Sequence, residues 1–217
     1  MVNADKLEKL AQDATENEVA TISDKVRTIT LQMLSTGELD AAALKQVMSA
    51  VVNGAQRGAA SHGEQAAQAL QQAMQGLDAA LAAAAEATQL AVQEAAGRSS
   101  EFSRQGLKKT VDDLAALESL FVEIVAEAAK NTAGAAQTGM RELLGHFSAS
   151  GTAVGSQVKT ALAQLGSAVT DTAHGQVEAG TETVRKEGAL LAGMAAGILR
   201  GIAERLQPAP SSPHKDK

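Results

Sequence analysis

The first 207 residues of this chain contain no proline, and this absence restricts the possible folds more than any other feature. The three prolines stand at positions 208, 210 and 213. Proline is the residue that most strongly interrupts a helix, so a long stretch without it can be helical almost throughout. Breaks in such a chain come from glycine and from clusters of small polar residues. We therefore expect an all-α protein.

The longest of the expected helices spans residues 61–97. It begins with Ser61 and Glu64, a spacing typical of a capping box at a helix N-terminus. Apolar residues then recur at alternating steps of four and three, first as large side chains and later mainly as alanine: Leu70, Met74, Leu77, Leu81, Ala84, Thr88, Ala91 and Ala95. This is the heptad pattern of a helix with one apolar seam. At about 1.5 Å per residue the helix would be roughly 50 Å long, which favours an elongated bundle or coiled coil of long amphipathic helices.

Composition divides the chain into three parts. Residues 1–36 are expected to form short helices, the second beginning at Ser23, and residues 37–206 an alanine-rich bundle of long helices. Residues 207–217 are a tail of Pro, Ser and Lys that we expect to be disordered. Ser35 with Glu38 resembles a second capping box. We expect turns at the glycines within 53–63, at 97–101 and at 131–134.

Two stretches carry the strongest apolar faces. Residues 107–128 contain the most hydrophobic face of the chain, with Leu114, Phe121 and Val125, and we expect this helix at the centre of the bundle. Residues 154–158 and 165–169 are similar to each other eleven positions apart, and they include Val158 and Leu165. An eleven-residue repeat gives a straight helix with a narrow apolar stripe. Such a helix can pack in a bundle or lie on an apolar surface.

The last expected helix, 185–206, has glycine at every fourth position. Leu191, Ile198 and Ile202 form its apolar stripe, and beside them stand Gly193, Gly197 and Gly201. Small residues at this spacing let another backbone approach closely. The glycines therefore indicate either a helix for self-association or membrane contact, or a packing face inside the bundle. Residues 185–217 carry six basic and three acidic groups, a net charge of +3.

Charge and composition exclude several functions. A net charge of −6 argues against binding to duplex nucleic acid, and the absence of Trp and Tyr argues against stacking on single strands. The chain has no cysteine, and its four histidines have no partners at metal-ligand spacing. There is no nucleophile elbow and no phosphate-binding glycine loop. We expect no enzyme activity, no cofactor, no metal and no small-molecule substrate.

The N-terminal residues are charged where a signal peptide would be apolar. The longest uncharged apolar run, 188–199, has twelve residues, whereas a membrane span needs about twenty. These two observations favour a cytoplasmic protein.

The alanine- and glutamine-rich seam of 65–96, the apolar helix of 107–128, the small-residue repeats of 154–184 and the proline-containing tail together resemble the phasins. Phasins are helical proteins that coat polyhydroxyalkanoate storage granules in bacteria. Late-embryogenesis-abundant and apolipoprotein-like proteins use eleven-residue repeats as well. The resemblance covers roughly residues 25–206 and implies a cytoplasmic, oligomer-forming, non-catalytic coat on an apolar surface.

Three functional hypotheses follow. In the first, the helices open and lay their apolar stripes on a polyester granule or lipid surface, with binding through Leu114, Phe121, Val125, Val158, Leu165 and Ile198. In the second, a coiled-coil scaffold docks a partner protein through the face of 107–128 and never opens. In the third, the protein is membrane-associated through 188–206. Because alanine buries little apolar area, we expect modest cohesion between the helices and predict self-association.

Overall fold

The computed structural model describes residues 4–36, 41–97 and 104–171, and every element in these ranges is a helix. The elements in chain order are α1 (Ala4–Thr15), α2 (Val19–Thr36), α3 (Ala41–Ala59), the 3₁₀ helix η1 (Ala60–Gln65), α4 (Ala66–Gly97), α5 (Arg104–Asn131), α6 (Gly134–Ser150) and α7 (Ala153–Asp171). No strand occurs in the described ranges. The prediction of an all-α protein is confirmed.

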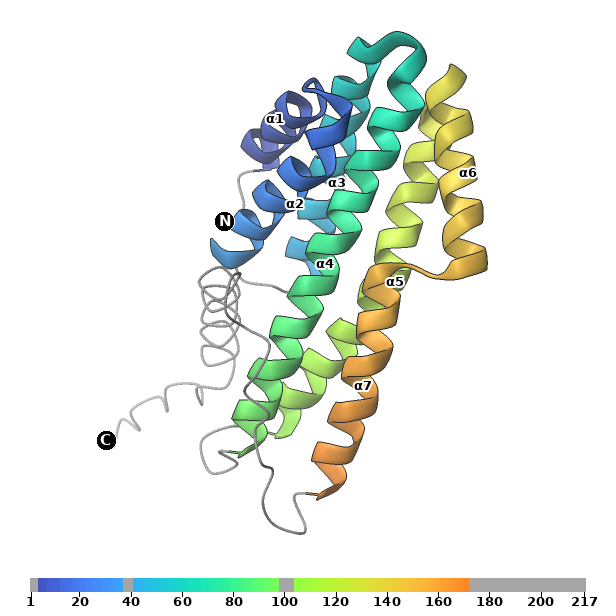
Figure 1. The fold of residues 1–217 in the computed structure, drawn as a ribbon. Coiled ribbons are helices and arrows are strands. Elements are labelled where there is room, and N and C mark those ends of the chain that lie inside the picture. Colours follow the sequence, from blue (N-terminus) through green and yellow to red (C-terminus); the bar gives the residue numbers. More distant parts are fainter. Residues whose placement is uncertain (1–3, 37–40, 98–103, 172–217) are drawn as a thin grey trace, which may run out of the picture.

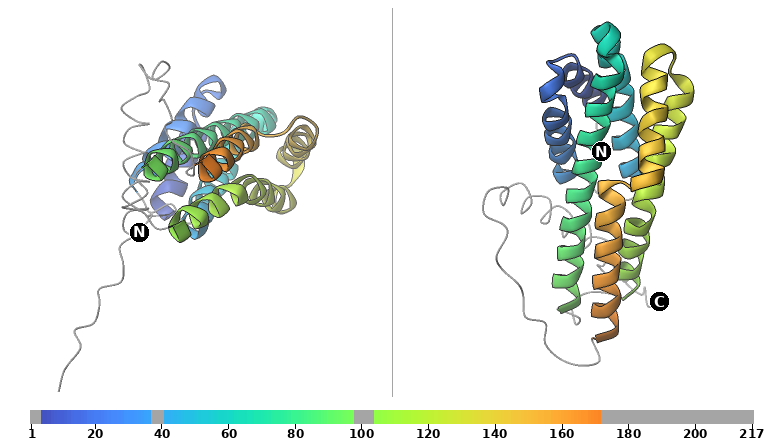
Figure 2. Two further views of the ribbon diagram at one scale, coloured as in Figure 1. Left: turned by 90° about the horizontal axis from the view of Figure 1, so that it is seen from below. Right: turned by 45° about the vertical axis from the view of Figure 1, so that its right-hand side comes forward.

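Helix α4 is the element around which the others pack. It contacts every other described α-helix. Helices α1, α2 and α3 lie beside the first half of α4, whereas α6 and α7 follow one another along its other side, next to α5 (Figures 1 and 2). The last α-helix of the described ranges, α7, lies beside the second half of α4 (Figure 1). The molecule therefore has two ends that differ in how many helices surround α4.

The expectation that the helix of residues 107–128 lies at the centre is wrong. This helix is α5, which lies at the side and packs mainly on α3, α6 and α7. The central helix must bury several faces, and α4 can do so because it carries small side chains in most directions. Its alanines at positions 69, 73, 80, 84, 85 and 87 are all buried. By contrast, α5 keeps a charged face in water, with Glu123, Glu127 and Lys130 exposed.

The predicted capping box at the start of the long helix does not form. The hydroxyl of Ser61 donates to the carbonyl oxygen of Gly58 at 2.7 Å, so it bonds backwards instead of capping the next turn. Gly63 interrupts the helix with φ 56° and ψ −117°, a left-handed conformation that glycine adopts without strain. As a result α4 begins at Ala66, five residues later than predicted.

The glycines at 54 and 58 do not form a turn. Helix α3 continues to Ala59, and both glycines lie inside it where α1 crosses. A Cβ atom at Gly54 would stand 2.8 Å from the Cβ of Ala11, and one at Gly58 would stand 2.5 Å from the carbonyl oxygen of Gln12. These glycines therefore allow two backbones to approach closely.

Of the other predicted helix boundaries, some agree with the structure and some differ from it by a few residues. Helix α2 begins at Val19 instead of Ser23 and ends at Thr36. The hydroxyl of Ser35 donates to the carbonyl oxygen of Gln32 at 2.8 Å within α2, so Ser35 does not cap the following helix, and Glu38 lies outside the described residues. The break predicted at 131–134 is confirmed, with Gly134 at φ 66°. A break at Gly151 was not predicted.

Alanine is the most frequent residue of the core in the described ranges, as expected, but larger side chains contribute as well. The heptad residues Leu70, Met74, Leu77 and Leu81 are fully buried. Phe121 on α5 and Phe147 on α6 pack with ring centroids 5.5 Å apart. The interior therefore combines small alanine side chains on α4 with larger side chains where α5 packs on α6.

Candidate functional site

Four of the predicted surface-binding residues lie inside the core. Leu114, Phe121 and Val125 on α5 and Val158 on α7 are each at most 4% exposed, and all four belong to one hydrophobic cluster. Leu165 is in α7, but its side chain lies outside what the structure describes. Ile198 and the glycines at 193, 197 and 201 also lie outside the described residues. In this arrangement the α5 and α7 faces reach an external surface only if the helices separate.

The N-terminus of α7 is bonded to a buried carboxylate of α4. Asp78 is 7% exposed. Its Oδ2 accepts a hydrogen bond from the backbone N–H of Ala153 at 2.8 Å, and its Oδ1 accepts one from that of Val154 at 2.9 Å. The first N–H groups of a helix have no partner within the helix, so Asp78 satisfies two of them from a neighbouring helix.

A second carboxylate reaches the same turn from α5. The hydroxyl of Thr152 donates to Oε1 of Glu118 at 3.1 Å and accepts from the backbone N–H of Gly155 at 2.9 Å. Gly155 makes room for this carboxylate, since a Cβ atom there would collide with it, standing 2.6 Å from Oε2. We call Asp78, Glu118 and Thr152 the α7 clamp, because they bond the first turn of α7 to both α4 and α5.

Burial makes the charged form of Asp78 unfavourable. Desolvation raises the pKa of the Asp78 carboxyl above its ordinary value, the hydrogen bonds from Val154 and Ala153 oppose that rise, and the negative charge of Glu118 adds to it. The net direction is upward. The attachment of α7 is therefore directional but carries a desolvation cost, which water would relieve if α7 moved away.

Sequence reasoning missed the α7 clamp. Asp78 sits next to the heptad residue Leu77, in a stretch whose clearest pattern is its apolar seam. One signal could have revealed it: Asp78 is the only charged residue between Glu64 and Glu86. A single acidic residue within an apolar and alanine-rich stretch is expected to have a specific partner, because an unpaired buried charge is costly.

Farther along, a pair of glutamines also joins α7 to α4. Nε2 of Gln89 on α4 donates to Oε1 of Gln164 on α7. Between this pair and the clamp, α7 contributes only modest apolar side chains to the interface, with Val154, Val158 and Ala161 buried. The described part of the α7 interface therefore has polar bonds at its first turn and at Gln164, with small apolar contacts between them.

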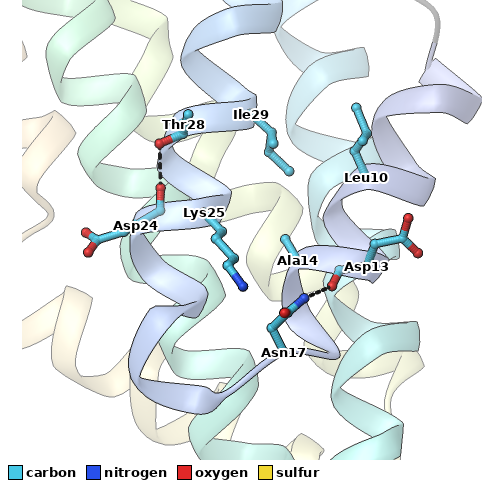
Figure 3. A pocket seen from close by; sticks show the side chains of 8 residues that line it. All are labelled: Leu10, Asp13, Ala14, Asn17, Asp24, Lys25, Thr28 and Ile29. Carbon is cyan, nitrogen blue, oxygen red and sulfur yellow. Dashed lines mark hydrogen bonds between the residues drawn. The ribbon is translucent and has the colours of Figure 1, made fainter.

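A separate open groove lies between α1 and α2 and has a volume of about 400 Å³. Figure 3 shows its lining residues: Leu10, Asp13, Ala14, Asn17, Asp24, Lys25, Thr28 and Ile29. Two of its polar side chains bond to backbone carbonyls four residues earlier in the chain. Thr28 donates to the carbonyl oxygen of Asp24 at 2.8 Å, and Asn17 donates to that of Asp13. Polar groups thus do not converge on the groove as they do in a catalytic or small-molecule site.

Two features are absent from the described ranges, a metal-binding cluster and a membrane-spanning helix. No group of three or more His, Asp or Glu side chains there is placed to hold a metal ion. None of the helices described in the structure combines the length and the apolar character needed to cross a membrane.

The comparison with protein families gives one result. A family model described as a family of unknown function (DUF6781) matches residues 1–208. The chain belongs to this family. No curated protein matches the chain, and no solved structure matches it. The matched residues include all of the described helices, from α1 to α7.

Proposed function

We propose that this protein is a non-catalytic, phasin-like coat protein that binds an apolar surface, such as a polyester granule or a lipid surface, through the faces of α5 and α7. In this proposal the molecule is an elongated bundle of amphipathic helices that exchanges burial between helices for burial on the surface. The charged faces stay in water throughout. The cytoplasmic location and the self-association belong to the same proposal.

The observation that carries the proposal is the two-sided character of α5 and α7. On α5, Leu114, Phe121 and Val125 are buried while Glu123 and Glu127 are exposed. On α7, Val154, Val158 and Ala161 are buried, whereas Ser156, Lys159 and Thr160 are exposed. A helix with one apolar stripe and one polar face can lie in the plane of an apolar surface as readily as it packs in a bundle.

The composition of the interface supports an exchange of this kind. Apolar burial stabilises by about 25 cal/mol per Å², and alanine and valine offer little area on each side chain. The second half of α4, beside which α7 lies, has several buried alanines, including Ala84, Ala85 and Ala87. A flat apolar surface can therefore replace these contacts at a modest net cost.

The second hypothesis, a scaffold that docks a partner through the face of 107–128 without opening, has less support. Phe121 and Val125 are fully buried, so they are inaccessible to a partner of the closed bundle. The third hypothesis depends on residues 188–206, which lie outside the described residues, and it stays a prediction.

A tethering experiment tests the proposal. The chain has no cysteine, so Gln89→Cys with Gln164→Cys, joined by a short bismaleimide, ties α7 to α4 where the glutamine side chains now meet. The matched control is Glu8→Cys with Arg57→Cys, which ties α1 to α3 where these residues form an ion pair. Mass spectrometry confirms each cross-link, and flotation with polyester particles and with lipid vesicles measures binding.

We expect the α4–α7 tether to weaken particle binding by about tenfold or more, equivalent to about 1.4 kcal/mol. The α1–α3 tether should bind as the untethered protein does. The proposal is wrong if the untethered protein does not bind to particles or vesicles, or if both tethered forms bind equally well.

A further inference from the structure

We propose that α7 is the helix that separates first from the bundle, and that the α7 clamp of Asp78, Glu118 and Thr152 sets how often it separates. This inference rests on the proposed function, because it names the step that would control surface binding. Its evidence is nevertheless independent of any surface, since it concerns how α7 is attached in the free protein.

The clamp gathers several polar attachments of α7 in one turn. Asp78 bonds to two backbone N–H groups of that turn from α4, and Glu118 bonds to Thr152 from α5. These bonds are all made to groups that water can satisfy equally well once α7 has moved. Loss of the clamp therefore releases the start of α7 from both neighbours at once.

A glycine joint next to the clamp allows α7 to move as a unit. Gly151, between α6 and α7, has φ 79°, and a Cβ atom at this position would have no atom within 4 Å. Helix α6 is completed at this point by a hydrogen bond of 2.9 Å from the N–H of Gly151 to the carbonyl oxygen of Phe147. Rotation at Gly151 and Thr152 can therefore change the direction of α7 without breaking a hydrogen bond of α6.

Helices α1 and α6 are attached by kinds of contact that α7 lacks in the described ranges. Helix α1 meets α3 at Gly54 and Gly58, where the backbones are in direct contact, and its last carbonyl, that of Thr15, lies 2.6 Å from Nε2 of His62. Helix α6 is packed on α5 through the ring pair of Phe121 and Phe147. Helix α7 has neither a backbone contact of this kind nor an aromatic side chain in the described ranges.

Desolvation of Asp78 limits how strongly the clamp holds α7. Desolvation is the largest of the effects on this carboxyl group, and it raises the pKa. When α7 leaves, Asp78 regains water, and this gain offsets part of the loss of its two hydrogen bonds. The clamp thus holds α7 by directional bonds, and the desolvation of Asp78 makes that hold weaker than the bonds alone would give.

Amide hydrogen exchange on the free, full-length protein tests the inference. The readout is the exchange of amides 157–163, which follow the first turn of α7 and do not bond to the clamp. Asp78→Ala removes both acceptor oxygens, and we expect exchange of these amides to become about fivefold faster, as for the loss of a typical helix cap. Asp78→Asn keeps one acceptor oxygen and should give a smaller increase.

Two further variants complete the design. Thr152→Val keeps the shape of the side chain and removes its hydroxyl, so it provides a second test if Asp78→Ala fails to fold. Asp112→Ala, which changes an exposed aspartate of α5, is the matched control and should leave exchange in α7 unchanged. Faster exchange confined to α7 supports the inference. Unchanged exchange in α7, or an equal increase in α1, α3 and α7, overturns it.

Particle binding by the same variants separates the two proposals. If α7 controls binding, Asp78→Ala should associate with polyester particles faster by the same factor as its exchange increases. If exchange in α7 responds as predicted but neither the wild type nor any variant binds particles or vesicles, the proposed function fails while the control of α7 by the clamp is supported.

Discussion

Asp78 of α4 and Val154 of α7 are 76 positions apart in the sequence, and a hydrogen bond of 2.9 Å joins the carboxylate of one to the backbone N–H of the other. The same carboxylate also binds the N–H of Ala153. A helix N-terminus is usually capped by the residue just before it. Here Thr152 has that role, and Asp78 supplements it from a distant segment, so the position of α7 on α4 is fixed by a specific polar contact as well as by apolar packing.

The raised pKa of Asp78 predicts a pH dependence of stability. Because the folded state holds this proton more tightly than the unfolded state, the favourable contribution is complete below the unfolded pKa of about 3.9 and is lost as the pH rises through the folded pKa. Asp78→Asn removes the titration. We therefore expect the free energy of unfolding of Asp78→Asn, relative to wild type, to increase as the pH rises from about 4 toward neutral.

Urea unfolding of both proteins at a series of pH values measures this difference. Taking the difference cancels the contributions of the other carboxylates, which titrate in both proteins. A difference that is constant with pH, or that decreases as the pH rises, would contradict the assignment of a buried, desolvated carboxylate at this position.

Substitution of the crossing glycines should detach α1. In Gly54→Ala the new methyl group would collide with the carbonyl oxygen of Glu8 and approach the Cβ of Ala11. Overpacking of this kind costs about 1–3 kcal/mol. We expect a loss of that size in urea unfolding, together with faster amide exchange in α1.

Gly145→Ala is the matched control for this substitution. Gly145 is an exposed residue inside α6, and a Cβ atom there would meet no atom within 4 Å. Alanine is the better helix former, so this variant should gain about 0.5–1 kcal/mol. If both variants lose stability equally, the close approach of α1 to α3 is not what Gly54 provides.

Removal of the Phe121 side chain should have the largest effect among single core changes on α5. Phe121 is fully buried and packs on Phe147 of α6. Phe121→Ala should cost about 3–5 kcal/mol, measured as a decrease in the midpoint of urea unfolding. Leu10→Ala, at a position 37% exposed, should cost much less. Equal losses would show that α5 and α6 are not packed through this ring pair.

Periodicity and the absence of proline were enough to predict helices and the buried seam of Leu70, Met74, Leu77 and Leu81. Local signals were less informative. Gly54 and Gly58 resemble a turn in the sequence, yet they are helical, because the need for room comes from α1, which the local sequence does not reveal. The capping box predicted for Ser61 and Glu64 does not form, because Gly63, which lies between them, has a positive φ that interrupts the helical geometry.

In the candidate site, too, spacing within one helix could be predicted, whereas contacts between helices could not. The apolar residues of α5 and α7 could be predicted from their spacing, and the structure places the described ones together in the core. The clamp could not be predicted by spacing, since Asp78, Glu118 and Thr152 come from three separate segments. Only the isolation of Asp78 in an apolar stretch distinguishes it in the sequence. Contacts between distant segments depend on how the helices are arranged, which periodicity within one helix does not specify.

The most direct test of the central claim, that the helices separate when the protein binds an apolar surface, is a distance measured across the α4–α7 interface. Spin labels at Gln75→Cys on α4 and Lys159→Cys on α7 occupy exposed positions and leave the clamp intact. Pulsed electron paramagnetic resonance then gives the distance distribution with and without polyester particles. We predict a single short distance in solution and a longer, broader distribution on particles. An unchanged distribution for protein that is bound to the particles would contradict the account.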